Sequence, residues 1–369
     1  MTASSSDPAR AERRADFLKA AGWGAADVAP FPGDASTRAY FRLRDGARAA
    51  ILMDAPAGAE APACPPGADP ETRAALGYNA LARLAGPNTA AFAALAGALT
   101  ARGFSAPTVF EADLEAGFLI LEDLGDALYA RAIPGGADEA QLYLAAADTL
   151  GAIHRSSFED EPEAFGARWR IQAYDDTALL AETELFLDWY APERGDAPGA
   201  AARADWAQAW RQVLPALDSH APGLSLRDYH AENLLWLPER EAEARVGLID
   251  FQDALFGHPA YDLISLIEDA RRDVRNDLTG PVTDRFFDAA GLADRDAFDA
   301  AAAILAAQRN AKILGIFVRL ARRDGKPRYL DLLPRVAGHF VRDISHPALG
   351  PVRAAVRELA PHVFAEADR

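Results

Sequence analysis

Two short apolar segments, separated by a charged turn, constrain the fold of this chain more than any other feature. Residues 234–237 and 246–249 are apolar and strand-length, and residues 238–243 between them carry four charged side chains. This pattern predicts a β-hairpin. Asn233 directly precedes the first strand and Asp250 directly follows the second, so the hairpin would bring these two side chains next to each other.

A further carboxylate, Asp228, lies five positions before Asn233. An Asp, an Asn five residues later and a second Asp after a following strand are the parts of a phosphoryl-transfer site. Asp228 would accept the proton of an attacking hydroxyl, while Asn233 and Asp250 would hold Mg²⁺, a hard ion that prefers oxygen ligands. A capping loop beside a solvated turn is the alternative, and the hairpin context favours the catalytic interpretation.

Composition limits the class of protein. The chain has 369 residues, 50% of them hydrophobic, a net charge of −17 and a single cysteine, Cys64. We therefore expect a globular chain without an internal disulfide or a cysteine metal cluster. No apolar run approaches the ~18–20 residues of a membrane span, and residues 1–7 have no signal-peptide pattern. A cytoplasmic protein that binds neither membrane nor nucleic acid is expected, and its oligomeric state stays open.

The secondary-structure pattern changes along the chain. Strands are predicted at residues 40–44, 49–53, 109–110 and 117–121, and again in the hairpin. Helices are predicted at residues 8–21, 88–103, 141–155, 177–190, 201–217, 261–269, 300–322 and 351–367. The fold class is therefore α+β with two lobes. We expect a nucleotide-binding lobe over residues 1–121, a hinge at 122–126 and a helical lobe with the catalytic loop and substrate site over 127–369.

Several further segments, in this order and spacing, carry a family resemblance. They are Ala35-Ser36-Thr37 with Tyr40-Phe41-Arg42, Met53-Asp54-Ala55-Pro56, residues 118–125 (FLILEDLG), residues 186–190 (FLDWY), and Asp250-Phe251-Gln252-Asp253-Ala254 with Tyr261-Asp262-Leu263. Over roughly residues 17–351 the chain resembles the aminoglycoside phosphotransferase and choline kinase superfamily. It is most similar to the bacterial anomeric N-acetylmuramate/N-acetylglucosamine kinases of cell-wall sugar recycling.

The resemblance implies a protein-kinase-like two-lobe fold, a magnesium ion, and ATP as phosphate donor. It implies Asp228 as the catalytic residue and Asn233 and Asp250 as metal ligands. It also implies contacts to ATP from a loop over the phosphates and from a hinge that meets the adenine through its backbone. These residues are Ser36, Thr37 and Arg38 in the loop and Glu122 and Leu124 in the hinge. An ordinary hairpin turn remains the alternative for residues 36–37.

Two positions depart from the kinase pattern. Leu226 replaces the histidine that often precedes Arg-Asp in the catalytic loop. The lysine expected on the third strand is also missing, because the chain has no lysine between Lys19 and Lys312. The Lys–Glu ion pair of protein kinases is therefore absent. Arg38 and Arg42 are the nearest replacement cations for the phosphates, although Arg42 could equally be an outward-facing strand residue.

The acceptor is expected to be a small molecule. Only twelve positions separate Asp250 from Asp262, which leaves no room for a long activation segment, while 74 positions separate His154 from Asp228. A helical insertion there could enclose a sugar pocket. Candidate substrate-binding residues are Arg170, Tyr174, Glu184, Tyr190 and His230, with Arg271, Arg272 and again Arg170 as candidates for a substrate carboxylate. Each could instead be an ordinary packed or exposed helix residue.

Three functions follow from these features. The first is an ATP-dependent sugar 1-kinase that phosphorylates the anomeric hydroxyl of N-acetylmuramate and N-acetylglucosamine, an amino-sugar substrate class. The second is a small-molecule kinase for an aminoglycoside or a choline-like amine, which the charge of −17 would suit. The third is a non-catalytic nucleotide-binding scaffold, suggested by the missing lysine and opposed by the intact Asp228, Asn233 and Asp250.

Overall fold

The computed structural model describes residues 8–31, 38–56, 61–195 and 197–369, with one side chain, that of Arg194, outside the description. The packing divides the chain into two compact units. Unit 1 contains residues up to 149 together with 156–172 and 231–255, and unit 2 contains residues 150–155, 173–230 and 256–369. These units do not follow chain order, and the predicted lobe boundary at residues 122–126 stays a prediction.

Unit 1 contains an antiparallel sheet of five strands in the order β1-β2-β3-β5-β4. Its strands are β1 (Asp27–Pro30), β2 (Ala39–Asp45), β3 (Arg48–Asp54), β4 (Val109–Asp113) and β5 (Phe118–Leu121). The central hairpin pairs Ala39 with Asp54 and Asp45 with Arg48, and Gly46 at its turn has a φ of 60°, which favours glycine. The strands predicted over residues 40–44, 49–53 and 117–121 are confirmed.

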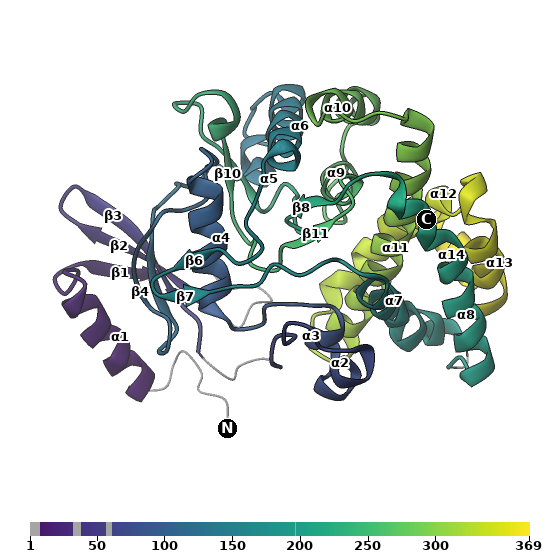
Figure 1. The fold of residues 1–369 in the computed structure, drawn as a ribbon, viewed down its shortest axis with the longest axis horizontal. Helices are drawn as coiled ribbons and strands as arrows, with labels where there is room; N and C mark the ends of the chain where they lie inside the picture. The colour runs from purple at the N-terminus through teal and green to yellow at the C-terminus, as the bar shows by residue number, and fades with distance from the viewer. Residues whose placement is uncertain (1–7, 32–37, 57–60, 196) are drawn as a thin grey trace. The chain divides into compact units, whose positions relative to one another are not determined.

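Helix α1 (Pro8–Ala20) covers this sheet through an apolar core (Figure 1). Leu18 and Trp23 pack against buried side chains of β2, β3 and β5, including Leu43 and Ile120. A buried ion pair accompanies the apolar contact: Arg10 donates from Nε to Asp54 Oδ1 at 2.8 Å. Arg14 Nη1 also lies 3.3 Å from Asp54 Oδ2, so two arginines fasten α1 to the end of β3.

The rest of unit 1 consists of short helices and hairpins. These are α2 (Pro70–Leu76), α3 (Tyr78–Leu81), α4 (Thr89–Thr100), α5 (Tyr129–Ala132), β6 (Glu163–Ala164), β7 (Ala167–Arg168), β9 (Leu234–Trp236), η4 (Ala242–Arg245) and β10 (Val246–Leu248). Asn88 caps α4 by accepting from Ala90 N at 2.9 Å. Helix α6 (Glu139–Arg155) begins in unit 1 and ends in unit 2.

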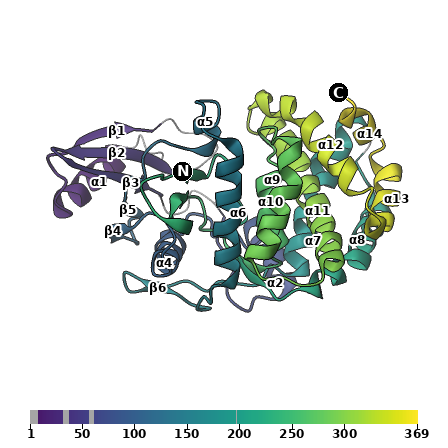
Figure 2. The ribbon, with the colours of Figure 1, turned by 90° about the horizontal axis from the view of Figure 1, so that it is seen from above.

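Unit 2 is helical and is built around α11 (Arg295–Arg322). Figure 2 shows α11 next to α7 (Asp176–Leu185), α9 (Ala260–Ile267) and α12 (Leu333–Asp343), which contact it. By length and composition α11 could cross a membrane, but 78% of its apolar window is buried in the protein. Its apolar character is accounted for by its central place in this helical core.

The remaining elements of unit 2 surround this core. They are η1 (Phe186–Tyr190), η2 (Ala191–Arg194), α8 (Ala200–Val213), η3 (Leu214–Ser219), β8 (Gly223–Ser225), α10 (Asn276–Ala289), η5 (Pro327–Leu332), η6 (Pro347–Leu349), α13 (Gly350–Leu359) and α14 (His362–Ala367), with β11 (Leu255–Gly257) at the boundary. The predicted helix over 351–367 is two helices in the structure. The break falls at Pro361, because proline has no N–H for a continuing helix.

Candidate active site

The predicted hairpin is present in unit 1. Strands β9 and β10 pair antiparallel, with Leu248 opposite Leu234. One step further along, Ile249 N donates to Asn233 O at 3.1 Å. Asn233 is therefore held beside the residue that directly precedes Asp250, so the backbone brings the two predicted metal ligands to one end of the hairpin.

Asp250 has an open carboxylate on a constrained backbone. Its side chain is 45% exposed and its φ of 61° lies in the left-handed region, which Asp tolerates better than most residues. Gln252 Nε2 donates to Asp250 Oδ1 at 2.8 Å, and Arg38 Nη1 lies 3.8 Å from the same oxygen. Backbone strain that is held in place at a polar, open position is typical of functional sites.

Arg38 and Tyr40 approach Asp250 from the start of β2. Arg38 is mostly buried and also donates from Nη2 to Gly86 O at 2.7 Å, which fixes its guanidinium. Burial raises the pKa of Tyr40 to about 12, against the lowering effect of Arg38 and with a further increase from Asp250. Tyr40 therefore stays protonated near these two groups. Sequence reasoning missed it, because an alternating strand gives no sign of which side chain faces a site.

Arg42 forms ion pairs with two carboxylates. Its Nε lies 2.8 Å from Asp123 and its Nη1 lies 2.8 Å from Asp126. The hydrogen bond to Asp126 comes first among the causes that raise the pKa of Arg42, ahead of the opposing effect of burial. Of the two candidate phosphate cations, the one beside Asp250 is Arg38, and Ser36 and Thr37 lie outside the described residues.

The predicted hinge segment, residues 122–126, follows β5, and the side chain and backbone of Glu122 hold it in place. The Glu122 carboxylate accepts from Thr108 Oγ1 at 3.1 Å and pairs with Arg240 Nη2 at 2.5 Å. Its backbone N–H donates to Thr108 O at 2.8 Å. Leu124 lies against the hairpin, with its Cδ1 3.4 Å from the position that a Cβ atom would take on Gly247. The segment is thus tied to β4 on one side and to the hairpin on the other.

The loop after Asp250 is held without the Lys–Glu pair of protein kinases. Strand β3 has no lysine, and α4 has no acidic residue that could pair with one. Phe92 of α4 instead stacks on Phe251, with ring centroids 5.0 Å apart. Asp253 accepts from Ala85 N at 2.6 Å. Ring packing and a carboxylate cap therefore position this loop.

Asp228 belongs to unit 2, in the loop that follows β8. The buried carboxylate of Asp262, on α9, accepts from Leu226 N at 2.6 Å and from Arg227 N at 2.8 Å. Burial raises the pKa of Asp262 to about 6, although these backbone hydrogen bonds lower it. Leu226 is buried where many kinases have a histidine, and Arg227 has a left-handed φ of 72°. The loop is thus shaped by its backbone contacts to Asp262.

The carboxylate of Asp228 lies in a positive environment. Burial alone would raise its pKa, but His230, Lys312, Arg227 and Arg309 together outweigh burial, so the pKa is lowered. A carboxylate with this pKa is ionised at neutral pH and can accept a proton from a hydroxyl. Lys312 was not among the residues predicted from the sequence.

His230 lies two residues after Asp228 and is buried. Its Nε2 is 3.4 Å from Arg271 Nη1, and its backbone N–H donates to Asp228 O at 3.2 Å. Burial lowers the pKa of His230, against the raising effects of Asp269 and Asp228. These contacts fit a structural hydrogen-bonding residue that places Arg271 near the catalytic loop.

The other residues predicted to bind substrate differ in their surroundings, and the two tyrosines among them are buried. Tyr190 is buried and its ring stacks on Phe186 and on His362, so the ring is not exposed for contact with a sugar. Tyr174 is buried and donates from its hydroxyl to Glu182.

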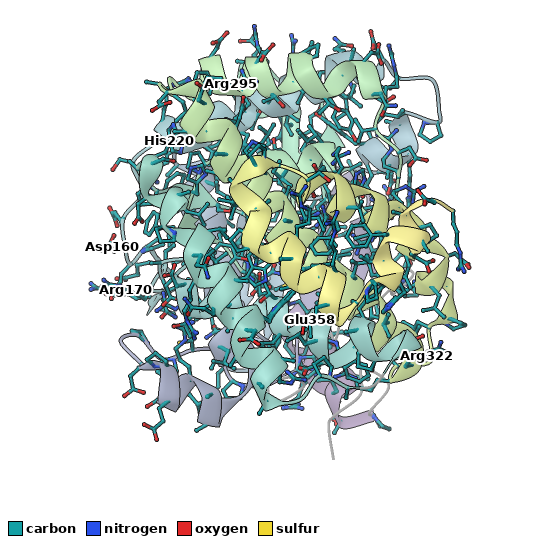
Figure 3. The ribbon with its side chains drawn as sticks, turned by 90° about the vertical axis from the view of Figure 1, so that its right-hand side faces the viewer. Asp160, Arg170, His220, Arg295, Arg322 and Glu358 are labelled. Carbon is teal, nitrogen blue, oxygen red and sulfur yellow. The ribbon has the colours of Figure 1, made fainter. Side chains whose placement is uncertain are left out.

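Two of the charged candidates form ion pairs with other side chains. Glu184 pairs with Arg203 at 2.8 Å. Arg170, in unit 1, lies beside Asp160 in Figure 3 and pairs with it at 3.5 Å and with Glu161 at 3.0 Å. Arg272 is half-buried in the segment after α9, next to the exposed Arg271. Among these charged candidates, Arg271 contacts His230, two residues after Asp228.

The residues predicted for one reaction fall into both compact units. Asn233, Asp250 and Arg38 belong to unit 1, and Asp228, His230 and Arg271 belong to unit 2.

Comparison with known proteins identifies the family. A model described as the phosphotransferase enzyme family matches residues 27–304. The chain belongs to this family. An N-acetylmuramate/N-acetylglucosamine kinase of Caulobacter vibrioides is 47% identical over 345 residues, covering 94% of this chain and 95% of the relative. A protein of the same name from Pseudomonas aeruginosa is 32% identical over 87% of this chain and 85% of the relative. The resemblance stated from the motifs is confirmed.

Solved structures agree on the fold. The choline kinase LicA of Streptococcus pneumoniae matches 92% of this chain and 99% of its own, with a TM-score of 0.56 at 14% identity. The GDP complex of an aminoglycoside 2′-phosphotransferase matches 90% of this chain and 99% of its own, with a TM-score of 0.53 at 12% identity. The protein-kinase-like α+β fold expected from the sequence is confirmed.

Proposed function

We propose that this protein is an ATP-dependent kinase that phosphorylates the anomeric hydroxyl of N-acetylmuramate and N-acetylglucosamine. The relatives that cover nearly the whole chain support this amino-sugar substrate class by their names. The observation that supports the chemistry is the hairpin, which holds Asn233 at the same end as the open carboxylate of Asp250, while Asp228, whose pKa is lowered by neighbouring positive groups, lies five residues before Asn233.

The anomeric oxygen of the sugar attacks the γ-phosphorus of ATP, and its proton passes to the Asp228 carboxylate. A bond forms between the sugar oxygen and phosphorus while the bond from phosphorus to the β,γ-bridging oxygen breaks, and ADP leaves. An anomeric hydroxyl is more acidic than the other sugar hydroxyls because the ring oxygen withdraws charge. A carboxylate whose pKa is lowered by its surroundings is therefore an adequate base.

The donor set of unit 1 fits a magnesium ion. The described residues contain no group of three or more His, Cys, Asp or Glu side chains arranged for a metal. The carboxylate of Asp250 and the amide oxygen of Asn233 are oxygen donors, and Mg²⁺ is usually held by one or two carboxylates, waters and substrate phosphates. Asn233 and Asp250 would hold it, and the bound ion would neutralise charge on the transferring phosphoryl group.

Arg38 is proposed as the cation that replaces the missing third-strand lysine. Its guanidinium is fixed by Gly86 O and lies 3.8 Å from Asp250, at the end of the hairpin where the phosphates would meet the metal. Arginine binds phosphate bidentately, so it can substitute for a lysine point charge. Ser36 and Thr37 would add contacts over the phosphates, and the backbone at Glu122 and Leu124 would contact the adenine.

The lactyl carboxylate of N-acetylmuramate requires a local cation, because the protein has a net charge of −17. Arg271 is the best supported of the three candidates, since it is exposed and contacts His230 beside the catalytic Asp228. Arg170 is already paired with two carboxylates. The expected partner is thus an amino sugar, and the expected role is the recycling of cell-wall sugars in the cytoplasm. The protein is not expected to bind nucleic acid or a membrane.

A panel of acceptors tests this proposal. ADP release is measured with Mg·ATP and each of N-acetylglucosamine, N-acetylmuramate, choline and an aminoglycoside, with Asp228→Asn as the matched inactive variant. Turnover with the two amino sugars that is lost in the variant is expected. Turnover confined to the amines would favour a kinase for cationic substrates. No acceptor-dependent turnover would favour the non-catalytic scaffold.

A further inference from the structure

A backbone segment of two residues, Ala85 and Gly86, contacts two parts of the proposed phosphate site. Asp253, which follows the proposed metal ligand Asp250 in the same loop, accepts from Ala85 N at 2.6 Å. The next carbonyl, Gly86 O, accepts from Arg38 Nη2 at 2.7 Å. The partners of these two contacts are 168 and 48 positions apart in the sequence, so both contacts depend on the tertiary fold. The segment therefore joins the loop after Asp250 to the residue that precedes β2.

These contacts form a closed ring within unit 1. Arg38 Nη1 lies 3.8 Å from Asp250 Oδ1, and the two residues that join Asp250 to Asp253 along the chain are both buried. The ring runs from Asp250 along the chain to Asp253, across to residues 85–86, on to Arg38 and back to Asp250. All of its members belong to unit 1. A displacement of the 85–86 segment would therefore move the Arg38 guanidinium relative to Asp250.

The backbone at Gly86 is also fixed by its own conformation. Its φ of 60° lies in the left-handed region, and a Cβ atom at this position would lie 2.9 Å from Ala61 O. Asn79 Nδ2 donates to the same carbonyl oxygen at 3.0 Å. Glycine is therefore required here, and the carbonyl group that accepts from Arg38 has little freedom to turn.

The distances around Arg38 show which partner holds its guanidinium. Nη2 is at hydrogen-bonding distance from Gly86 O, whereas the 3.8 Å between Nη1 and Asp250 Oδ1 is beyond the range of a hydrogen bond. The guanidinium is thus anchored on a peptide carbonyl and kept beside the carboxylate without a hydrogen bond to it. This arrangement keeps a positive charge next to Asp250 and leaves the carboxylate open to a metal ion.

We propose that Asp253 is a positioning residue for nucleotide binding, which holds the 85–86 segment so that Gly86 O places the Arg38 guanidinium beside Asp250. Asp253 would have the part of the glutamate in the missing Lys–Glu pair, but it acts through a peptide group and not by pairing with the cation directly. The inference rests on the proposed role of Arg38 as the phosphate cation. A loop cap that only stabilises the fold is the alternative account.

A double-mutant cycle on Mg·ATP affinity, measured by calorimetry without acceptor, separates the two accounts. Asp253→Ala is expected to weaken binding about three- to tenfold, as for one lost hydrogen bond. Loss of a negative charge by itself would favour an anionic ligand, so the expected change has the opposite sign to a simple charge effect. In the Arg38→Ala background the same change should alter the affinity less than about twofold, because the group that it positions is gone. Additive effects of the two changes would overturn the proposal.

A conservative variant and a matched control sharpen this measurement. Asp253→Asn keeps an acceptor oxygen for Ala85 N, so its affinity should stay within about twofold of wild type. An equal loss in Asp253→Asn and Asp253→Ala would assign the effect to charge and overturn the proposal. Asp113→Ala is the control, since Asp113 at the end of β4 accepts from Ala116 N at 2.8 Å in the same way. It should leave the affinity unchanged, and a loss equal to that of Asp253→Ala would indicate general destabilisation and contradict the role of Asp253.

NMR of the arginine side chains provides a readout without nucleotide. The protein is labelled with ¹⁵N at arginine, and the Arg38 signals are identified by their loss in Arg38→Ala. A guanidinium that is held by Gly86 O should show slow rotation about its Nε–Cζ bond and separate Nη signals. Asp253→Ala should average these signals, and Asp253→Asn should retain them. Unchanged Arg38 signals in a folded Asp253→Ala protein would overturn the proposal.

Two further outcomes are covered. If Asp253→Ala does not fold, Gly86→Ala takes its place, because a Cβ atom 2.9 Å from Ala61 O must displace the same segment. Unchanged Arg38 signals and Mg·ATP affinity in Gly86→Ala would overturn the proposal. If the wild type does not bind Mg·ATP, the proposed function fails, and the NMR comparison still decides whether Asp253 positions Arg38.

Discussion

The two carboxylates proposed for the reaction have opposite surroundings. Asp250 in unit 1 is 45% exposed, and its described partners are Gln252 and a guanidinium 3.8 Å away. Asp228 in unit 2 has its pKa lowered, against burial, by four neighbouring groups that can carry positive charge. A metal ligand must stay open until its ion and the phosphates arrive. A base must be charged before the acceptor binds, so its counter-charges are built into the fold.

The largest effect is expected at the prearranged carboxylate. Asp228→Asn keeps the shape of the side chain and removes the proton acceptor, so kcat should fall on the order of 10²–10⁴-fold. Steady-state kinetics and Mg·ATP titration would be compared, and nucleotide affinity should change little. A variant within a few-fold of wild type would remove Asp228 from the mechanism.

At the open carboxylate the expected loss is in binding. Asp250→Ala removes a full negative charge from the metal site, whereas Asn233→Ala removes a neutral carbonyl. Calorimetric titration of Mg·ATP should show an affinity loss at least about tenfold larger for Asp250→Ala, equivalent to ~1.4 kcal/mol. Equal losses in the two variants would contradict this ranking.

The two units also differ in their response to acid. All seven histidines lie in unit 2, and burial lowers the pKa of His154, His230, His258 and His339, that of His258 to about 3. Between pH 6.5 and 3 the unfolded chain binds a proton at His258 that the folded chain does not. The contribution of neutral His258 to the free energy of unfolding is therefore complete above pH 6.5. It decreases as the pH falls below 6.5.

Denaturant unfolding at pH 7.5 and pH 5.0 measures this contribution. For His258 alone, the free energy of unfolding should fall by about 2 kcal/mol between these two values. The difference in pH dependence between wild type and His258→Gln isolates the residue from the carboxylates. Identical pH dependence in the two proteins would show that His258 is not buried in its neutral form.

Arg38 and Arg42, both in unit 1, are the two candidate cations for the phosphates of ATP. Arg38→Ala should raise the KM for ATP about tenfold, because a charge-assisted hydrogen bond to phosphate is lost. Arg42→Ala should leave the KM for ATP near the wild-type value and lower the Tm, since Arg42 is paired with Asp123 and Asp126. The reverse outcome would identify Arg42 as the phosphate cation.

The smallest expected effect concerns the exposed cation near the base. Arg271→Ala should raise the KM for N-acetylmuramate about two- to fivefold, within the range of exposed ion pairs, and spare N-acetylglucosamine. Arg170→Ala is the matched control, because Arg170 is paired with Asp160 and Glu161. Equal changes for both sugars would exclude a carboxylate contact by Arg271.

Local patterns made part of this site predictable. The hairpin of β9 and β10 follows from residues close together in sequence, where the rules of strand periodicity and turn composition apply. The pairing of Arg42 could not be predicted, because Asp123 and Asp126 lie 81 and 84 positions away. Glu182 and Lys312 each read as a charged position on a helix. Only the packing of α7, α9 and α11 shows that they are buried together.

The most direct test of the proposed reaction is the structure of its product. N-acetylglucosamine is incubated with the protein and Mg·ATP, and the product is analysed by proton-coupled phosphorus NMR. A phosphorus signal coupled to the single anomeric proton, absent with Asp228→Asn, is the predicted result. Coupling to the two protons of carbon 6, or phosphorylation of aminoglycosides but not of the amino sugar, would contradict the account.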